Sequence, residues 1–226
     1  MKKSNYTLHL LLMAVMALYS ITGTAQEPLT QQQKWEQKVR AYEKQDSLNP
    51  PGKHIILFTG SSTIENWKTL QQDIPGKNVL NRGISGTKTS DLLHYANRVI
   101  RPYHADQIFL YEGDNDIGFK LSPDSILLRF KQLFSYIRQV NAGAEIIFIT
   151  IKPSPRRLKD SVAIQQTNLL IKDFLQTEKN TGYADVYTAM LTPGKQLVPA
   201  YYREDGLHLT AEGYKIWTDV IKPFIK

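Results

Sequence analysis

The chain has 226 residues, of which 42% are hydrophobic and 22% are charged. This is ordinary usage for a globular protein and excludes a wholly disordered chain or a collagen-like repeat. The chain contains no cysteine, so disulfide bonds, a cysteine nucleophile and cysteine ligands for zinc are also excluded. The formal net charge is +7, from 28 Lys and Arg against 21 Asp and Glu. The basic residues are scattered singly or in pairs, whereas a nucleic-acid-binding protein usually has a basic stripe or cluster, so we expect no nucleic-acid partner.

The first 25 residues have the pattern of a secretory signal peptide. Lys2 and Lys3 give a positive start, residues 8–21 are almost uncharged and apolar, and Gly23 to Ala25 supplies small residues at a cleavage site. The alternative is a membrane anchor, but a spanning helix needs roughly 20 apolar residues and this run is shorter. We therefore predict cleavage after Ala25 and export, to the periplasm or the exterior, without stable membrane insertion afterwards.

The next segment, residues 26–52, is expected to be an N-terminal helix and a linker. Between residues 31 and 45 the apolar side chains of Trp35, Val39 and Tyr42 recur at helical spacing among charged residues. A Pro-Pro-Gly sequence at residues 50–52 then supplies a turn.

From residue 53 onward, short apolar segments alternate with longer amphipathic ones. Buried strands are expected at His54–Thr59, Asn78–Asn81, Gln107–Tyr111, Glu145–Ile151 and Ala184–Tyr187. Helices are expected at about 63–73, 89–100, 123–141, 160–180 and 211–222, with N-caps at Thr89 or Ser90, at Ser122 and at Thr210. Strands that alternate with helices predict an α/β fold, in which about five mostly parallel strands form the middle of a three-layer α/β/α sandwich. Residues 53–226 are expected to form one domain.

In an open parallel sheet, functional groups gather beyond the carboxyl ends of the strands. Four segments at or near these ends combine glycine with Ser, Asn, Asp or His: residues 60–63, 81–86, 112–116 and 205–210. A hydroxyl nucleophile needs a nearby base, an acid that orients the base, and donors for the developing oxyanion. Together the four segments contain residues of each type.

Each part of such a site has a candidate residue. Ser62 would lie at a strand-to-helix turn, where free backbone N–H groups face the reacting carbonyl oxygen. His208 would be the base, and Asp205, three residues earlier, would orient its ring. Gly86 allows a second backbone N–H to approach, and the amide of Asn115 can offer a third donor without adding charge.

These segments resemble, in order and spacing, the sequence blocks of the SGNH, or GDSL-like, hydrolase superfamily across nearly all of residues 54–224. The matching residues are Ser62 in Gly60-Ser61-Ser62, Gly86 at the end of residues 81–86, Asn115 in Gly113-Asp114-Asn115-Asp116, and Asp205 with His208 as Asp-x-x-His. The resemblance implies a flavodoxin-like fold, a Ser62–His208–Asp205 triad, and an oxyanion hole made by Ser62, Gly86 and Asn115. The segment Phe58 to Ser62, followed by Trp67, is similar to acylhydrolases related to platelet-activating-factor acetylhydrolases.

One departure from the family pattern leaves the nucleophile open. Many family members carry Asp before the nucleophile, where this chain has Ser61. Ser61 is therefore the alternative nucleophile. Ser85 is not in a Gly-x-Ser-x-Gly elbow, because Gly86 follows it directly, and we expect it to be a loop hydroxyl.

The sequence and this resemblance thus predict an exported serine esterase that cleaves small acyl esters with no metal or organic cofactor. The resemblance implies acetyl esters of carbohydrates as the leading substrates, because exported bacterial proteins of this kind often serve polysaccharide use. Lysophospholipid or thioester cleavage by the same fold is an alternative. Two other classes stay open: a metal-dependent phosphodiesterase that uses Asp114, Asp116 and His208, and a carbohydrate-binding module without activity. The sequence does not give the oligomeric state.

Overall fold

A computed structural model describes residues 28–226, so the predicted signal peptide, residues 1–25, lies outside the described residues. By its internal contacts the chain divides into two units, Met1–Lys34 and Trp35–Lys226. All strands of the described chain belong to the second unit. None of the helices within residues 28–226 is both long enough and apolar enough to span a bilayer.

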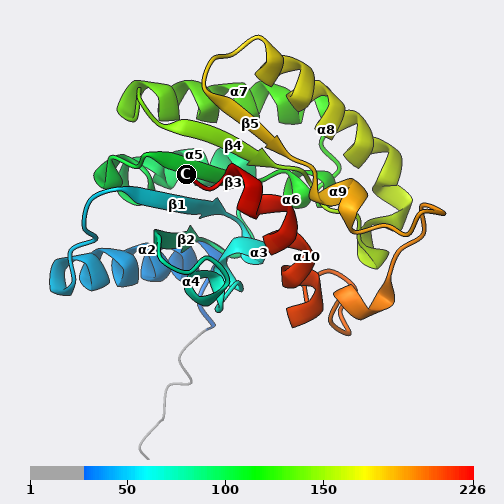
Figure 1. Cartoon of the computed structure of the whole chain (residues 1–226), viewed down its shortest axis with the longest axis horizontal. Helices are drawn as coiled ribbons and strands as arrows, with labels where there is room; N and C mark the ends of the chain where they lie inside the picture. The colour runs from blue at the N-terminus through cyan, green and yellow to red at the C-terminus, as the bar shows by residue number, and fades with distance from the viewer. Residues whose placement is uncertain (1–27) are drawn as a thin grey trace, which may run out of the picture. The chain divides into compact units, whose positions relative to one another are not determined.

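Five strands form a single parallel sheet in the second unit (Figure 1). They are β1 (Ile55–Gly60), β2 (Asn78–Gly83), β3 (Gln107–Tyr111), β4 (Glu145–Ile149) and β5 (Thr181–Ala184). Their order across the sheet is β2-β1-β3-β4-β5, and every neighbouring pair is parallel. The predicted fold class is therefore confirmed, and the loops that leave β1, β2 and β3 emerge next to one another at one edge of the sheet.

The helices connect the strands. They are α2 (Gln31–Leu48), α3 (Ser62–Glu65), α4 (Leu70–Asp73), α5 (Thr89–Val99), α6 (Asp114–Gly118), α7 (Pro123–Val140), α8 (Ser161–Gln176), α9 (Val186–Ala189) and α10 (Ala211–Ile221). Four short 3-10 helices lie at Arg101–Tyr103, Pro155–Asp160, Pro199–Tyr201 and Lys222–Phe224.

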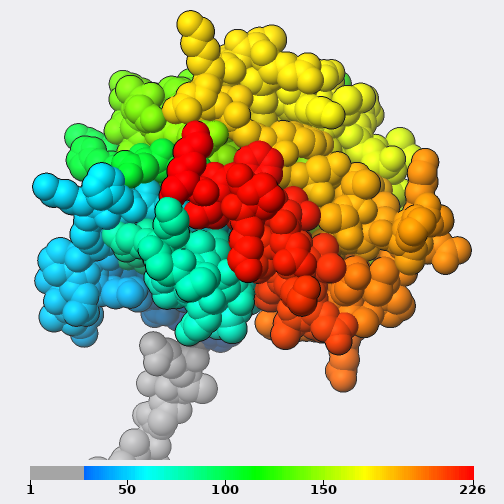
Figure 2. Space-filling model, viewed as in Figure 1, coloured from blue at the N-terminus to red at the C-terminus, as the bar shows by residue number. Residues whose placement is uncertain are grey.

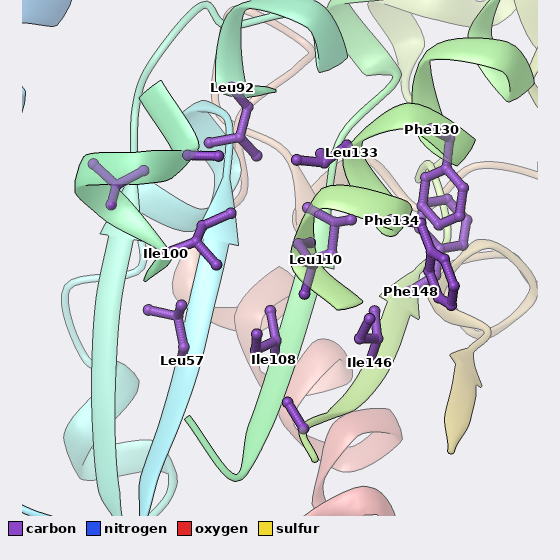
Figure 3. Packing of buried hydrophobic residues seen from close by; sticks show 14 of the residues in the cluster. Leu57, Leu92, Ile100, Ile108, Leu110, Phe130, Leu133, Phe134, Ile146 and Phe148 are labelled. Carbon is purple, nitrogen blue, oxygen red and sulfur yellow. The ribbon is translucent and has the colours of Figure 1, made fainter. Parts of the chain in front are cut away.

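Alternate residues of each strand face opposite layers, because successive side chains of a strand point to opposite sides. Leu57, Ile108 and Ile146 pack on one face, together with α5 and α7 (Figure 3). Phe130 and Leu133 of α7 extend towards these strands. Burial on this face fixes which side of the sheet each strand residue occupies.

The other face is rich in aromatic side chains. Phe58 of β1 stacks on Phe109 of β3, with ring centroids 4.5 Å apart. Trp67, between α3 and α4, stacks on Tyr214 of α10 at 5.2 Å and meets Trp217 edge-on at 6.1 Å. On the surface, α10 (red) lies beside the segment between β1 and β2 (teal) (Figure 2). These ring contacts hold the C-terminal helix against the segment that follows β1.

Two predicted elements are placed differently in the structure. The fifth strand is Thr181–Ala184, not Ala184–Tyr187, because Asp185 accepts a hydrogen bond from the Thr188 N–H and caps the short helix α9. The apolar residues after Ala184 are therefore helical. The single helix expected at 63–73 is two short helices, α3 and α4. In a continuous helix the Ile64 carbonyl oxygen would accept from the Lys68 N–H, but it accepts instead from the Trp67 N–H at 3.0 Å and from the Asn81 side chain at 2.6 Å.

The predicted helix caps are partly confirmed. Ser122 accepts from the Ser125 N–H at the start of α7, and Thr210 accepts from the Gly213 N–H at the start of α10. The N-cap of α5 is Lys88, not Thr89 or Ser90. Its N–H donates to the Asp91 carboxylate at 3.0 Å, so a side chain inside the first turn closes this helix end.

The backbone conformation at Gly60, the last residue of β1, and its close neighbour on β3 both require glycine. Its φ is +140°, and an added Cβ would lie 2.0 Å from the Tyr111 carbonyl oxygen. We expect Gly60→Ala to lower the free energy of unfolding by at least about 2 kcal/mol, because strain and steric overlap act together. Urea unfolding of the purified protein measures this change.

The matched control is Gly143→Ala, since nothing lies within 4 Å of a Cβ added there. We expect this control to change the free energy of unfolding by less than about 1 kcal/mol. Equal stability of the two variants would mean that β1 and β3 do not approach each other this closely.

Candidate active site

The segment after β1 brings Ser62 to the start of α3. Ser61 has extended backbone and is buried, whereas Ser62 is the first residue of the helix and is half-buried. The Oγ atom of Ser62 lies 3.0 Å from Nε2 of His208. Of the two candidate nucleophiles, the structure therefore brings Ser62 into contact with a histidine.

His208 lies in a tight loop before α10. The Arg203 N–H donates to the His208 carbonyl oxygen at 2.8 Å and closes this loop. Nδ1 of His208 lies 2.6 Å from Oδ2 of Asp205, and the other carboxylate oxygen accepts from the N–H groups of Leu207 and His208. Both oxygens of Asp205 are thus occupied, so the imidazole is held with Nε2 towards Ser62.

The surroundings of Asp205 favour its ionised form. Desolvation acts to raise the pKa of Asp205, but the hydrogen bonds from the His208 ring and from the two backbone N–H groups outweigh it. They hold the pKa of this carboxyl well below its usual range. A negative carboxylate therefore faces Nδ1 of His208, which favours the tautomer with its proton on Nδ1.

The loop after β2 provides Gly86, and the segment after β3 provides Asn115. Gly86 has a φ of +83°, and Nδ2 of Asn115 donates to the Thr87 carbonyl oxygen at 2.8 Å. A side-chain amide has two N–H donors, so Asn115 retains one for another acceptor. Within residues 28–226, the N–H groups of Ser62 and Gly86 donate to no other residue.

Three residues outside the predicted site hold the loop between β2 and α5. Nε1 of Trp35 donates to the Ser85 carbonyl oxygen at 2.8 Å, and the Ser85 N–H donates to Glu65 at 2.7 Å. Lys38 forms an ion pair with Glu65 at 2.7 Å. The sequence indicates Trp35 only as an apolar position of a helix and indicates no role for Glu65 or Lys38. No local sequence signal pairs these residues with a loop 20 to 50 positions away.

The acidic residues beside Asn115 are used internally. Asp114 is buried, and its carboxylate lies 2.6 Å from Nζ of Lys152 and 2.9 Å from Nε of Arg157. Asp116 accepts from the N–H and the hydroxyl of Thr89. The part of the chain that is described contains no cluster of three or more His, Cys, Asp or Glu side chains arranged to hold a metal ion.

The other described histidines lie apart from Ser62. His54 precedes β1, at the amino end of the sheet, and pairs with Asp106 at 2.9 Å. His94 is in α5, where its ring meets that of Tyr95 edge-on.

A cavity of about 430 Å³ opens beside His208 and Asn115. Most of its lining is polar or charged, including Asp205, Arg156 and Arg157, and its apolar side chains are Phe119 and Leu207. The site therefore combines a hydroxyl beside an imidazole and an imidazole beside a carboxylate, and Asn115 lines the same cavity as this histidine. This arrangement can perform nucleophilic acyl transfer.

The lowered pKa of Asp205 predicts a pH-dependent contribution to stability. A carboxyl group with a native pKa below its unfolded value, about 3.9, stabilises the fold above that pH and loses this effect as the pH falls through the native pKa. Asp205→Asn is uncharged at every pH. We expect the melting-temperature advantage of the unsubstituted protein over Asp205→Asn to shrink as the pH falls from about 4 to about 2. The side chain is 42% exposed, so the effect is small.

Thermal melts of the two proteins at matched ionic strength measure this difference. An advantage that stays constant down to about pH 2 would contradict the lowered pKa of Asp205.

Comparisons with known proteins agree with the geometry. The family model for the GDSL-like lipase/acylhydrolase family matches residues 28–216. A search of curated proteins finds no match. Among solved structures, a candidate platelet activating factor from Streptococcus pneumonia is 22% identical, with 97% of this chain and 99% of that chain covered and a TM-score of 0.76.

Two further solved structures share the fold. A candidate acylhydrolase from Bacteroides fragilis is 24% identical over 82% of this chain and 94% of that chain, with a TM-score of 0.72. A catalytic mutant of an acetylxylan esterase from Geobacillus stearothermophilus is 17% identical over 77% of this chain and 94% of that chain, with a TM-score of 0.65. Since the family model covers most of the chain, the protein belongs to the GDSL-like lipase/acylhydrolase family of ester hydrolases.

Proposed function

We propose that the protein is a serine esterase with Ser62 as nucleophile, His208 as general base and acid, and Asp205 as the residue that orients the imidazole. The observation that supports this most is the unbroken series of contacts from Asp205 to His208 at 2.6 Å and from His208 to Ser62 at 3.0 Å. The series ends at a serine on a helix N-terminus, where backbone N–H groups have no partner within the helix.

The reaction has two halves. In the first, Ser62 Oγ attacks the ester carbonyl carbon as its proton passes to Nε2 of His208. The bond from the carbonyl carbon to the alcohol oxygen then breaks, and His208 gives this proton to the departing alcohol. In the second half, water loses a proton to His208 and attacks the acyl group on Ser62. The carboxylic acid leaves, and Ser62 recovers its proton.

The negative oxygen of each tetrahedral intermediate needs donors. We assign the N–H groups of Ser62 and Gly86 and the second N–H of the Asn115 amide to this oxygen. All three are uncharged, so they can stabilise the oxyanion without attracting the substrate's ground state strongly.

The proposed substrates are short-chain esters, above all acetyl esters of carbohydrates. The cavity beside His208 has few apolar side chains, which suits a small acyl group and a polar alcohol better than a long fatty-acyl chain. One structural neighbour is an acetylxylan esterase, which agrees with this substrate class. Lysophospholipid and thioester substrates would need a longer apolar surface. We also propose export, on the pattern of residues 1–25.

The nucleophile can be identified directly. We expect purified protein to hydrolyse p-nitrophenyl acetate in excess EDTA, because an activated serine needs no metal ion, and to be inactivated by a fluorophosphonate. Mass spectrometry of the inactivated protein should find the label on Ser62. In a series of p-nitrophenyl esters, kcat/KM should decrease with increasing acyl length.

Ser61→Ala is the matched control and should still be labelled, whereas Ser62→Ala should not. Labelling of Ser61 would reassign the nucleophile, and complete loss of hydrolysis in EDTA would reject the serine mechanism. Binding of acetylated glycans without turnover would favour the binding-module alternative.

The role of Asn115 gives a second test of the mechanism. Its donor acts on an oxygen that is fully charged only in the transition state, so its loss should lower kcat and leave KM nearly unchanged. We expect Asn115→Ala to lower kcat by about 10²–10³-fold, as found for the loss of one oxyanion donor elsewhere. Steady-state kinetics on p-nitrophenyl acetate measure the change.

Asn115→Asp provides the sharper comparison, because it is nearly isosteric but places a negative charge beside the oxyanion. It should lower kcat at least as much as Asn115→Ala, and it should also lower the melting temperature, because a carboxylate cannot donate to the Thr87 carbonyl oxygen. If Asn115→Asp kept nearly full kcat, Asn115 would not be an oxyanion donor and would have only a structural role in the turn.

A further inference from the structure

Glu112 is a buried acid that the proposed mechanism does not use. It follows β3 directly and is only 1% exposed. Its Oε1 atom lies 2.7 Å from Oγ1 of Thr87, and its Oε2 atom is buried without a hydrogen-bond partner in residues 28–226. No ion pair of the described chain includes Glu112, although buried carboxylates are normally paired. Its position therefore requires a physical explanation.

The contacts of the Thr87 hydroxyl indicate whether Thr87 or Glu112 supplies the proton of the hydrogen bond between them. Oγ1 of Thr87 lies 2.8 Å from the Ile84 carbonyl oxygen as well as 2.7 Å from Glu112. A carbonyl oxygen can only accept, and the single hydroxyl proton of Thr87 cannot point at both oxygens, so when it points at Ile84 no Thr87 proton lies between Oγ1 and Glu112. The contact with Glu112 then requires a second proton, which a protonated carboxyl group can supply.

The surroundings of Glu112 favour this neutral form. Burial raises the pKa of Glu112 well above its usual range, and the negative charges of Asp116 on α6 and Asp91 on α5 raise it further. The contacts with Thr87 and with the Gly113 N–H act to lower this pKa but do not outweigh burial. Arg129 of α7 lies 3.5 Å from Asp116. Lys88 at the start of α5 lies 3.6 Å from Asp91. Both cations are therefore placed against other acids.

We propose that Glu112 is a neutral carboxylic acid that donates a hydrogen bond to Thr87 and is thereby a positioning residue for the oxyanion hole. The inference rests on the proposed function, since it assigns a role to the loop that carries Gly86. Glu112 itself does not contact the substrate. It acts through Thr87 alone.

Thr87 is the residue through which such an effect reaches both proposed donors. Gly86 precedes Thr87 in the chain, and the carbonyl oxygen of Thr87 accepts from the Asn115 amide at 2.8 Å. The N–H of Thr87 also points to the Ile84 carbonyl oxygen, at 3.4 Å. The direction of the Gly86 N–H and the direction of the Asn115 amide therefore both depend on where Thr87 lies.

The test compares two substitutions of nearly equal size. Glu112→Gln keeps a donor at the same place, and Glu112→Met keeps the volume but removes the hydrogen bond. We expect Glu112→Met to lower kcat on p-nitrophenyl acetate by about 10-fold or more with little change in KM, because loss of alignment affects the transition state. Glu112→Gln should stay within about threefold of the unsubstituted enzyme.

Thr87 supplies the second half of the test. Thr87→Val removes the hydroxyl and Thr87→Ser keeps it, so only Thr87→Val should lower kcat. Because both residues act through one contact, Glu112→Met combined with Thr87→Val should lower kcat about as much as either change alone. Additive losses would show that Glu112 does not act through Thr87.

The protonation state is read separately, from the infrared spectrum at neutral pH. The difference between the unsubstituted protein and Glu112→Gln should contain the C=O stretching band of a protonated carboxyl group. A carboxylate band there instead would overturn the assignment of a neutral acid. Equal kcat losses in Glu112→Gln and Glu112→Met, or none in Glu112→Met, would overturn the positioning role.

These outcomes are distinct from failure of the proposed function. Ser62 can be labelled and Asn115→Ala can lower kcat while Glu112→Gln and Glu112→Met do not differ as expected. In that case only the inference on Glu112 is wrong. If Ser62 is not labelled, the proposed mechanism itself fails.

Discussion

The contact between Ser62 and His208 joins residues that are 146 positions apart, and the rest of the site depends on it. It can form only if the segment after the first strand and the loop before the last helix reach the same edge of the sheet. Packing between these regions secures this. Trp67 stacks on Tyr214 of α10, and the Tyr214 hydroxyl donates to the Thr63 carbonyl oxygen at 2.8 Å. The core therefore sets the distance between the serine and the histidine before any substrate binds.

Partly buried polar groups then fix the loops that the sheet brings together. Parallel strands deliver loops to one edge, but they do not determine the direction of each N–H group. Here Glu65 and Trp35 hold Ser85, while Thr87 and Asn115 connect the loops after β2 and β3. Removing any one of these partners would remove a partly buried hydrogen bond that positions a loop. Rigid loops are what an oxyanion hole requires, since its donors must be in place before charge develops.

The sequence predicted the sheet, and it indicated candidate site residues, because strands and strand-end motifs both leave local signals. β3 has five consecutive buried residues, and its predicted bounds are those of the structure. Ser62, Gly86, Asn115, Asp205 and His208 occupy motifs at strand ends, where glycine and polar residues stand out. The fifth strand was misplaced by three residues, because β-branched and aromatic residues after Ala184 suit a strand as well as a buried helix. Glu112 and Glu65 could not be predicted, since the partner of each lies on another loop and no spacing rule connects them.

The two acids Asp205 and Glu112 illustrate how the fold assigns opposite states to one kind of group. Asp205 accepts three hydrogen bonds and stays ionised, so it can stabilise positive charge on the imidazole. Glu112 is buried beside other acids, and a proton on it removes a negative charge close to the proposed oxyanion hole. In the proposed reaction, positive charge develops on His208 and negative charge develops on the substrate oxygen. An ionised acid is favourable only beside the first of these charges, so the different burial of the two carboxyl groups suits the charge separation that acyl transfer requires.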